Sequence, residues 1–238
     1  MRAAEHAPRS PFQILECPHG LDRPAESDFY RASLHVLGFA LSGDNHHEDA
    51  LSVLESSLSM HLRLRSPDAD SIIRLRVNLA NCLAGLERYD ESIHMHRQNL
   101  ILATEVFGES HEQTLTSALN LAHTLTKSLF ASVDASGNRS PKDYHPEAIK
   151  LICEAVPKAQ HALGHDHELT LKLRYQHAFI LAVSPNVTLE EMVTAVSILT
   201  DTHDRACRVL GPQHPVSKMF QNMLGKIRAK LASFPESK

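Results

Sequence analysis

The sequence predicts an all-α fold, a solenoid of about four helix pairs followed by one capping helix. Two observations support this prediction. Apolar residues recur with helical spacing through most of the chain, and short sequence words return at a period of about 42 residues. The chain of 238 residues also has only 9 glycines and no tryptophan, which is unusual for a glycine-punctuated all-β protein.

The first word has the form G-x-x-H-x-x-T/S and occurs three times. Its glycines are Gly108, Gly164 and Gly211, which lie 56 and 47 residues apart. Each glycine follows a long helical pattern, so we expect it to adopt the left-handed conformation that ends a helix. The word is therefore predicted to be a helix–loop–helix joint, and its histidines, His111, His167 and His214, are predicted to cap or pack the joint.

The second word is N-L-A-x-x-L, which begins at Asn78 and again 42 residues later at Asn120. A weaker first copy, Leu37-Gly38-x-x-Leu41, lies another 42 residues upstream. Two insertions lengthen the period. Residues 132–141 are rich in Ser, Gly, Asn and Pro and are predicted to form a loop, and residues 184–186 mark a shorter one.

Each repeat is interpreted as two amphipathic helices because its apolar residues are three or four positions apart. The expected helices are 27–42, 46–64, 69–86, 89–107, 112–130, 145–163, 168–183, 188–210 and 214–232. Pro157 should kink or interrupt the sixth of these. A small residue recurs early in the second helix of each pair, where it would let neighbouring helices approach closely; these residues are Ala50, Ser92, Ala148 and Ala195.

Composition excludes several functional classes. The formal charge of −4 argues against broad nucleic-acid binding, which needs a concentrated basic face. No apolar run approaches the length of a membrane span, and no apolar core follows Met1 as in a secretory signal. The four scattered cysteines favour a reducing compartment, so we expect a cytoplasmic protein. Residues 1–26 contain four prolines and are predicted to be a disordered tail, followed by a solenoid over 27–232 and a short tail over 233–238.

No catalytic motif or nucleotide-binding loop is present, so we expect neither an enzyme nor a cofactor. The 17 histidines are the one compositional anomaly. None forms the H-E-x-x-H motif, and His94 and His96 point to different sides of a helix. We therefore expect no metal site, although a histidine-dependent metalloenzyme remains an alternative.

The combination of G-x-x-H-x-x-T, N-L-A-x-x-L and Tyr89-Asp90-Glu91-Ser92 resembles the tetratricopeptide repeats of the kinesin light chain type over about residues 27–232. Three departures stand out. Glu87 occupies a position that is usually Gly, Gln176-His177-Ala178 replaces Asn-Leu-Ala, and the long coiled coil of a kinesin light chain is missing.

The resemblance implies a right-handed α-α superhelix. It also implies a concave groove that binds a peptide, lined by the first helix of each pair. The predicted peptide-binding residues are Arg74, Asn78, Asn81, Thr116, Asn120, His123, Lys127, Lys172, Tyr175, Gln176 and Phe179, with His35 and Phe39 in the weaker first copy. Asn and Gln can pair with an extended peptide backbone, and the three cations would favour an acidic peptide.

The sequence thus predicts a non-enzymatic adaptor that binds a segment of another protein. An alternative is a regulatory repeat protein that senses a peptide or small ligand. The partner and the oligomeric state are not predicted.

Overall fold

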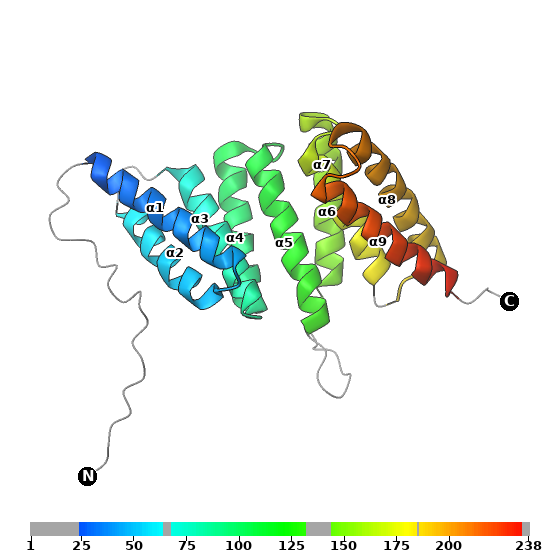
Figure 1. Ribbon diagram of the computed structural model, residues 1–238, viewed down its shortest axis with the longest axis horizontal. Helices are drawn as coiled ribbons and strands as arrows, with labels where there is room; N and C mark the ends of the chain where they lie inside the picture. Colours follow the sequence, from blue (N-terminus) through cyan, green and yellow to red (C-terminus); the bar gives the residue numbers. More distant parts are fainter. Residues whose placement is uncertain (1–23, 64–67, 132–143, 185, 235–238) are drawn as a thin grey trace, which may run out of the picture. The chain divides into compact units, whose positions relative to one another are not determined.

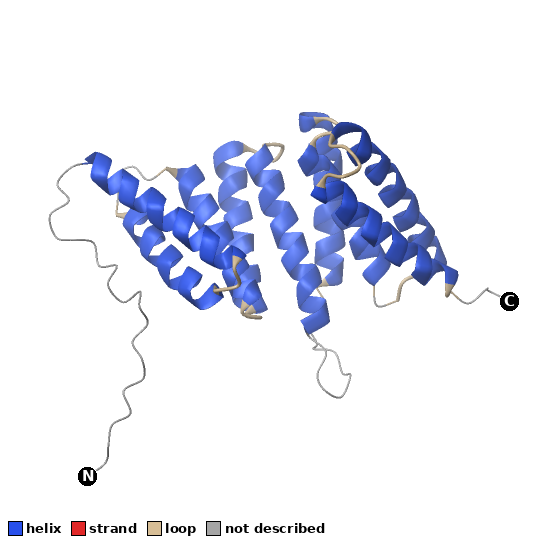
Figure 2. Cartoon of the chain, in the orientation of Figure 1, coloured by secondary structure: helices blue, strands red, loops and turns tan. Residues whose placement is uncertain are grey.

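The structure is a computed structural model that describes residues 24–63, 68–131, 144–184 and 186–234 (Figure 1). All regular secondary structure in these residues is helical (Figure 2). The nine helices of this part of the chain are α1 (Pro24–Gly43), α2 (His47–Leu62), α3 (Ala69–Gly85), α4 (Tyr89–Phe107), α5 (Glu112–Ala131), α6 (His145–Leu163), α7 (Glu168–Val183), α8 (Leu189–Val209) and α9 (Pro215–Ala232).

These bounds confirm the expected helices to within three residues at every end. The largest difference is at α1, which begins at Pro24, inside the segment expected to be a tail. Residues 1–23 of that predicted tail, the predicted loop over 132–141 and most of the C-terminal tail lie outside the described residues. None of the described helices is long and apolar enough to cross a membrane.

The chain divides into two compact units, one ending at Met95 and the other beginning at His96. In the first unit, α1 packs against both α2 and α3, and α2 packs against α3. Its core contains Leu54, Leu75, Leu79 and Cys82, all at most 1% exposed.

In the second unit each helix packs against the next from α5 to α9. The first helices of the pairs also form a layer of their own, since α5 contacts α7 and α7 contacts α9. The core of α7, α8 and α9 is centred on Leu171, Leu199 and Phe220, each 0% exposed. This sequential packing is the arrangement expected of a helical repeat.

The small residues predicted to permit close helix packing are all buried. Ala50, Ser92, Ala148 and Ala195 are each 0% exposed. Ser92 is polar, but its hydroxyl donates to the carbonyl of Ala80 at 2.6 Å, which removes the cost of burying it.

The three G-x-x-H joints have the predicted geometry. Gly108, Gly164 and Gly211 have φ of 87°, 95° and 91°, a region that glycine occupies without strain. The three histidines act as caps: Nδ1 of His111, His167 and His214 accepts a hydrogen bond from the backbone N–H two residues further on, at 3.2, 3.3 and 3.3 Å.

The threonine of the first two joint words ties the joint to the preceding helix, whereas the buried hydroxyl of Ser217 in the third word has no hydrogen-bond partner among the described residues. Thr114 donates to the carbonyl of Ala103 at 3.0 Å, and Thr170 donates to that of Ala159 at 3.4 Å. Sequence words seven residues long therefore encode both a glycine stop and the first bonds of the next helix.

Two departures from the repeat have different outcomes. Pro157 does not interrupt α6, which continues to Leu163. The residue is exposed, so water can bond the carbonyl that lacks its helical donor. Glu87, in contrast, keeps the glycine-type backbone of the position it occupies, with φ of 61°. Asn45, 42 residues earlier, has φ of 62° in the equivalent turn.

Candidate peptide-binding surface

The second unit presents a continuous row of polar and aromatic side chains along α5. Asn120 is half-buried, while His123 and Lys127 are exposed. Phe130 follows on the same face of the helix and is 59% exposed. We call the surface formed by Thr116, Asn120, His123, Lys127, Phe130, Lys172, Tyr175 and Phe179 the first-helix surface, because all of these residues lie on α5 or α7.

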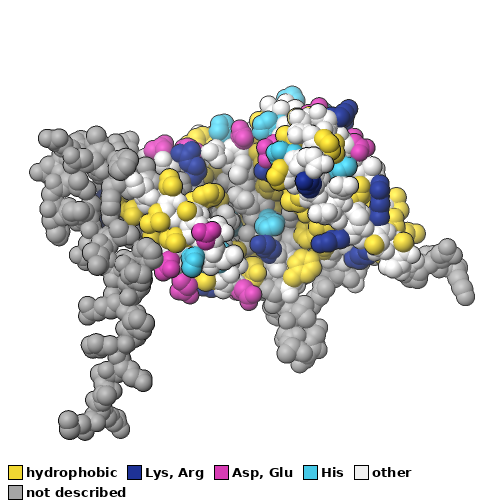
Figure 3. Space-filling model, in the orientation of Figure 1, with side chains coloured by type: hydrophobic (Ala, Val, Ile, Leu, Met, Phe, Trp, Pro, Cys, Tyr) yellow, Lys and Arg dark blue, Asp and Glu magenta, His cyan; other side chains and the backbone are white. Residues whose placement is uncertain are grey.

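Aromatic rings connect α5 to α7 and α9 at this surface. The ring of Phe130 lies 6.3 Å from that of Phe179, and Phe179 lies 6.3 Å from Tyr175. Tyr175 then stacks at 5.1 Å on Phe220, which is fully buried. The row therefore runs from an exposed ring on α5 to an anchored ring on α9. Figure 3 shows hydrophobic and basic side chains near one another over this part of the chain.

Gln176 occupies a different position from the one predicted for a peptide contact. Its side chain is 2% exposed, and Nε2 donates to Oγ1 of Thr126 on α5 at 3.2 Å. Gln176 also bonds the side chain of His123. Gln176 thus joins α5 to α7 beneath the first-helix surface. The side chains that form this surface belong to neighbouring residues on the two helices.

The environment of His123 favours its neutral form. Although part of the His123 side chain is exposed, neighbouring groups displace water from its imidazole, and this desolvation lowers the pKa of the ring. The nearby charge of Lys127 lowers the pKa further, and the bond to Gln176 acts in the opposite direction. At neutral pH the ring is therefore an uncharged donor and acceptor beside a cation.

The three predicted cations differ in their pairing. Lys172 lies 2.7 Å from Glu168 and Arg74 lies 2.6 Å from Asp70, both one turn earlier on the same helix. Among the described residues no carboxylate is paired with Lys127. The i,i+4 spacing of both pairs is readable in the sequence, so their mutual neutralisation could have been anticipated.

The remaining predicted residues belong to the first unit. Arg74 and Asn81 are exposed on α3, Asn78 is half-buried, and Phe39 on α1 is 66% exposed. The side chain of His35 lies outside the described ones.

Sequence reasoning missed Phe130 and the aromatic row. The signal was present, because Asn120, His123, Lys127 and Phe130 continue one helical spacing of three and four. Within the described parts of the chain, no three His, Cys, Asp or Glu side chains converge as metal ligands.

The comparisons agree with this architecture. Residues 71–128 match the tetratricopeptide repeat family. No curated protein sequence matches the chain.

Among solved structures, the fold resembles nearly identical TPR-like repeats from a kinesin light chain-like protein of Podosopora anserina. Two such structures have TM-scores of 0.60 and 0.59 at 16% and 18% identity, covering 89% and 91% of this chain and 100% of those chains. BtubC (BKLC) from P. vanneervenii has a TM-score of 0.52 at 14% identity, covering 90% of this chain and 86% of that one. At these identities the likeness concerns the fold.

Proposed function

The chain is a tetratricopeptide-repeat protein, and on that premise we propose that it is a non-enzymatic adaptor that binds a segment of another protein along the first-helix surface. The observation that carries the proposal is the row of Asn120, His123, Lys127 and Phe130 on one face of α5, next to the rings of α7.

Each group in this row suits one part of a peptide. The amide of Asn120 can donate to and accept from an extended backbone. Phe130 and Phe179 offer an apolar patch, and aromatic side chains of this kind contribute strongly to binding energy at interfaces. A carboxylate in the peptide would satisfy Lys127 without displacing an internal partner, so an acidic segment is favoured over a basic one.

Lys172 contributes less than Lys127 under this proposal. A peptide carboxylate at Lys172 must compete with Glu168, and the net gain from an exchange between exposed ion pairs is small.

The test begins with a random peptide library displayed on phage and selected against the full chain, followed by titration of the selected peptides. We expect Lys127→Glu and Phe130→Ala each to weaken binding by about tenfold, equivalent to about 1.4 kcal/mol. Lys150→Glu changes an exposed lysine on α6 and is the matched control. High salt should weaken the parent but have little effect on Lys127→Glu. Peptides that bind Lys127→Glu and Phe130→Ala as tightly as the parent would exclude the first-helix surface.

A further inference from the structure

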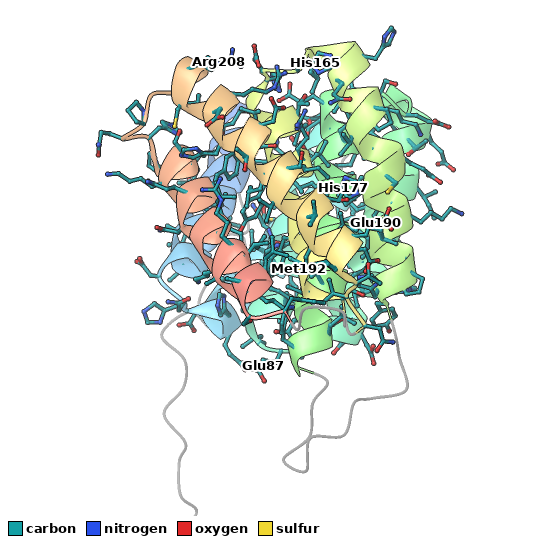
Figure 4. All side chains as sticks on the ribbon, turned by 90° about the vertical axis from the view of Figure 1, so that its right-hand side faces the viewer. Glu87, His165, His177, Glu190, Met192 and Arg208 are labelled. Atoms are coloured by element: carbon teal, nitrogen blue, oxygen red, sulfur yellow. The ribbon has the colours of Figure 1, made fainter. Side chains whose placement is uncertain are left out.

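A thiol and an imidazole meet where α6 packs against α7, away from the first-helix surface. Sγ of Cys153 lies 3.7 Å from Nε2 of His177. Cys153 is exposed and His177 is half-buried, so the pair is accessible from solvent. In Figure 4, His177 lies in projection between the ribbons of α6 and α8.

The repeat itself gives no packing reason for this imidazole. His177 stands at the leucine position of N-L-A, which is filled by Leu79 and Leu121 in two other repeats. Those leucines are 1% and 3% exposed. The fourth repeat therefore replaces an apolar core residue with a metal-ligating one at the point where it faces a cysteine.

The separation of the two atoms suits a shared metal ion. With bonds of about 2.3 Å to sulfur and about 2.0 Å to nitrogen, the two ligand atoms lie about 3.5 Å apart at a tetrahedral angle and about 4.3 Å apart when the ion is held linearly. The observed 3.7 Å lies between these values, so small side-chain rotations would bring both atoms onto one ion. Because no third ligand converges among the described residues, the pair fits an ion that accepts few protein ligands.

The charged groups near the pair have both signs. The guanidinium of Arg174 lies close enough to His177 to act on it electrostatically. Arg174 is itself paired with Asp201 at 2.6 Å, and Glu154 places a carboxylate next to Cys153.

We propose that Cys153 and His177 form a two-ligand binding site for Cu(I), a soft monovalent ion that thiolate and imidazole ligands favour. Binding replaces the thiol proton: the S–H bond breaks, an S–Cu bond forms, Nε2 donates its lone pair, and one proton is released to water without any change of oxidation state. The ion would link α6 to α7 and leave one side open to solvent.

The chain contains a second thiol–imidazole contact that serves as a comparison. Sγ of Cys207 lies 3.3 Å from Nε2 of His203, but both residues are on α8. An ion at that pair would not connect two helices. Cys82 is buried and inaccessible in the folded protein.

The experiment uses the full chain with Cys17→Ser and Cys207→Ser, titrated anaerobically with Cu(I) against a chromogenic Cu(I) chelator. We expect one equivalent of Cu(I) in this background and its loss in the additional Cys153→Ser variant. His177→Leu restores the residue of the other repeats, so it should fold, but it should bind Cu(I) at least tenfold more weakly. Cu(I) should also raise the thermal midpoint of the background protein, in which the bound ion links α6 to α7. It should not raise the midpoint of His177→Leu, in which the ion has no ligand on α7.

Equal Cu(I) affinity in His177→Leu would show that the thiol of Cys153 binds the ion without His177, and it would overturn the two-ligand site. Retention of the tight equivalent in Cys153→Ser, or no binding in the background, would overturn it as well.

Discussion

The side chain of Gln176 on α7 donates a hydrogen bond to the hydroxyl of Thr126 on α5, at 3.2 Å, and both residues are buried. The hydroxyl of Thr126 donates in turn to the carbonyl of Ala122 at 2.7 Å. These two hydrogen bonds therefore connect one repeat to the next. Gln176 occupies the position that is asparagine in two other repeats, at Asn78 and Asn120. It holds together the two helices that present the first-helix surface.

Replacing Gln176 with Ala should destabilise the protein by about 1–3 kcal/mol. The substitution removes the inter-helix hydrogen bond and leaves a cavity in a closely packed layer. Denaturant unfolding checks the value. Asn81→Ala, at an exposed position, is the control and should change stability by less than about 0.5 kcal/mol. Equal losses in the two variants would mean that the buried bond contributes nothing.

Ala122→Glu should reduce the free energy of unfolding by several kcal/mol. Ala122 is 0% exposed, and the substitution would bury a charge without a partner. Thermal melting followed by circular dichroism measures the loss. The milder Ala122→Val should cost about 1–3 kcal/mol through overpacking if the charged variant does not fold. Ala229→Glu, on the exposed side of α9, should melt like the parent.

Two glycine-to-alanine changes should act in opposite directions. A Cβ at Gly38 on α1 would lie 2.5 Å from Cγ of Leu54, which is 0% exposed and cannot move away, so Gly38→Ala should be destabilising by about 1–3 kcal/mol. Nothing lies within 4 Å of the same atom at Gly225 on α9, so Gly225→Ala should stabilise that helix by up to about 1 kcal/mol. Calorimetric unfolding of both variants tests this pair, and effects of the same sign would contradict the close approach of α1 to α2.

Glu87→Gly should stabilise the turn between α3 and α4. Glu87 has φ of 61°, which is strained for a residue with a side chain, and relief of that strain should contribute about 0.5–1 kcal/mol. The gain is measured as a higher midpoint in urea unfolding. Asn45→Gly serves as the comparison, because asparagine already tolerates the same backbone and should gain less. A lower midpoint for Glu87→Gly would show that flexibility of the unfolded chain outweighs the strain.

His96 should make the protein sensitive to acid. The side chain is 0% exposed, neither ring nitrogen has a hydrogen-bond partner among the described residues, and burial lowers its pKa from 6.5 to about 4, with a smaller contribution from His123. Between these two values the unfolded chain takes up a proton that the folded chain does not. Stability is therefore intact above about pH 6.5 and falls by up to about 3 kcal/mol as the pH approaches 4.

The measurement is the free energy of unfolding from pH 7.5 to 4.5 in the parent and in His96→Leu. The variant should show a shallower pH dependence and equal or higher stability at pH 7, because leucine removes two unpaired polar atoms. Parallel pH profiles would assign the acid sensitivity to other groups, and His123 and His177, whose pKa values are also lowered by burial, would be the next to test.

The sequence by itself determined the helices and the joints between them. Helical periodicity, the glycine that ends a helix and the histidine that caps the next are local features, encoded within a few residues of where they act. Gly164 and His167 therefore have the predicted roles, with φ of 95° and an N-cap bond to Leu169 at 3.3 Å. The small residues at fixed repeat positions were equally readable, because a tightly packed layer leaves no room for larger ones.

Only the tertiary structure decided which polar residues face solvent and which connect helices. Asn120 and Gln176 occupy equivalent repeat positions, yet the first is half-buried and the second is 2% exposed. The approach of Cys153 to His177, 24 residues away, likewise exists only after α6 and α7 pack together. Repeat spacing fixes the side of the helix on which a residue lies, but its exposure and its partners depend on side chains distant in the sequence, which local periodicity does not contain.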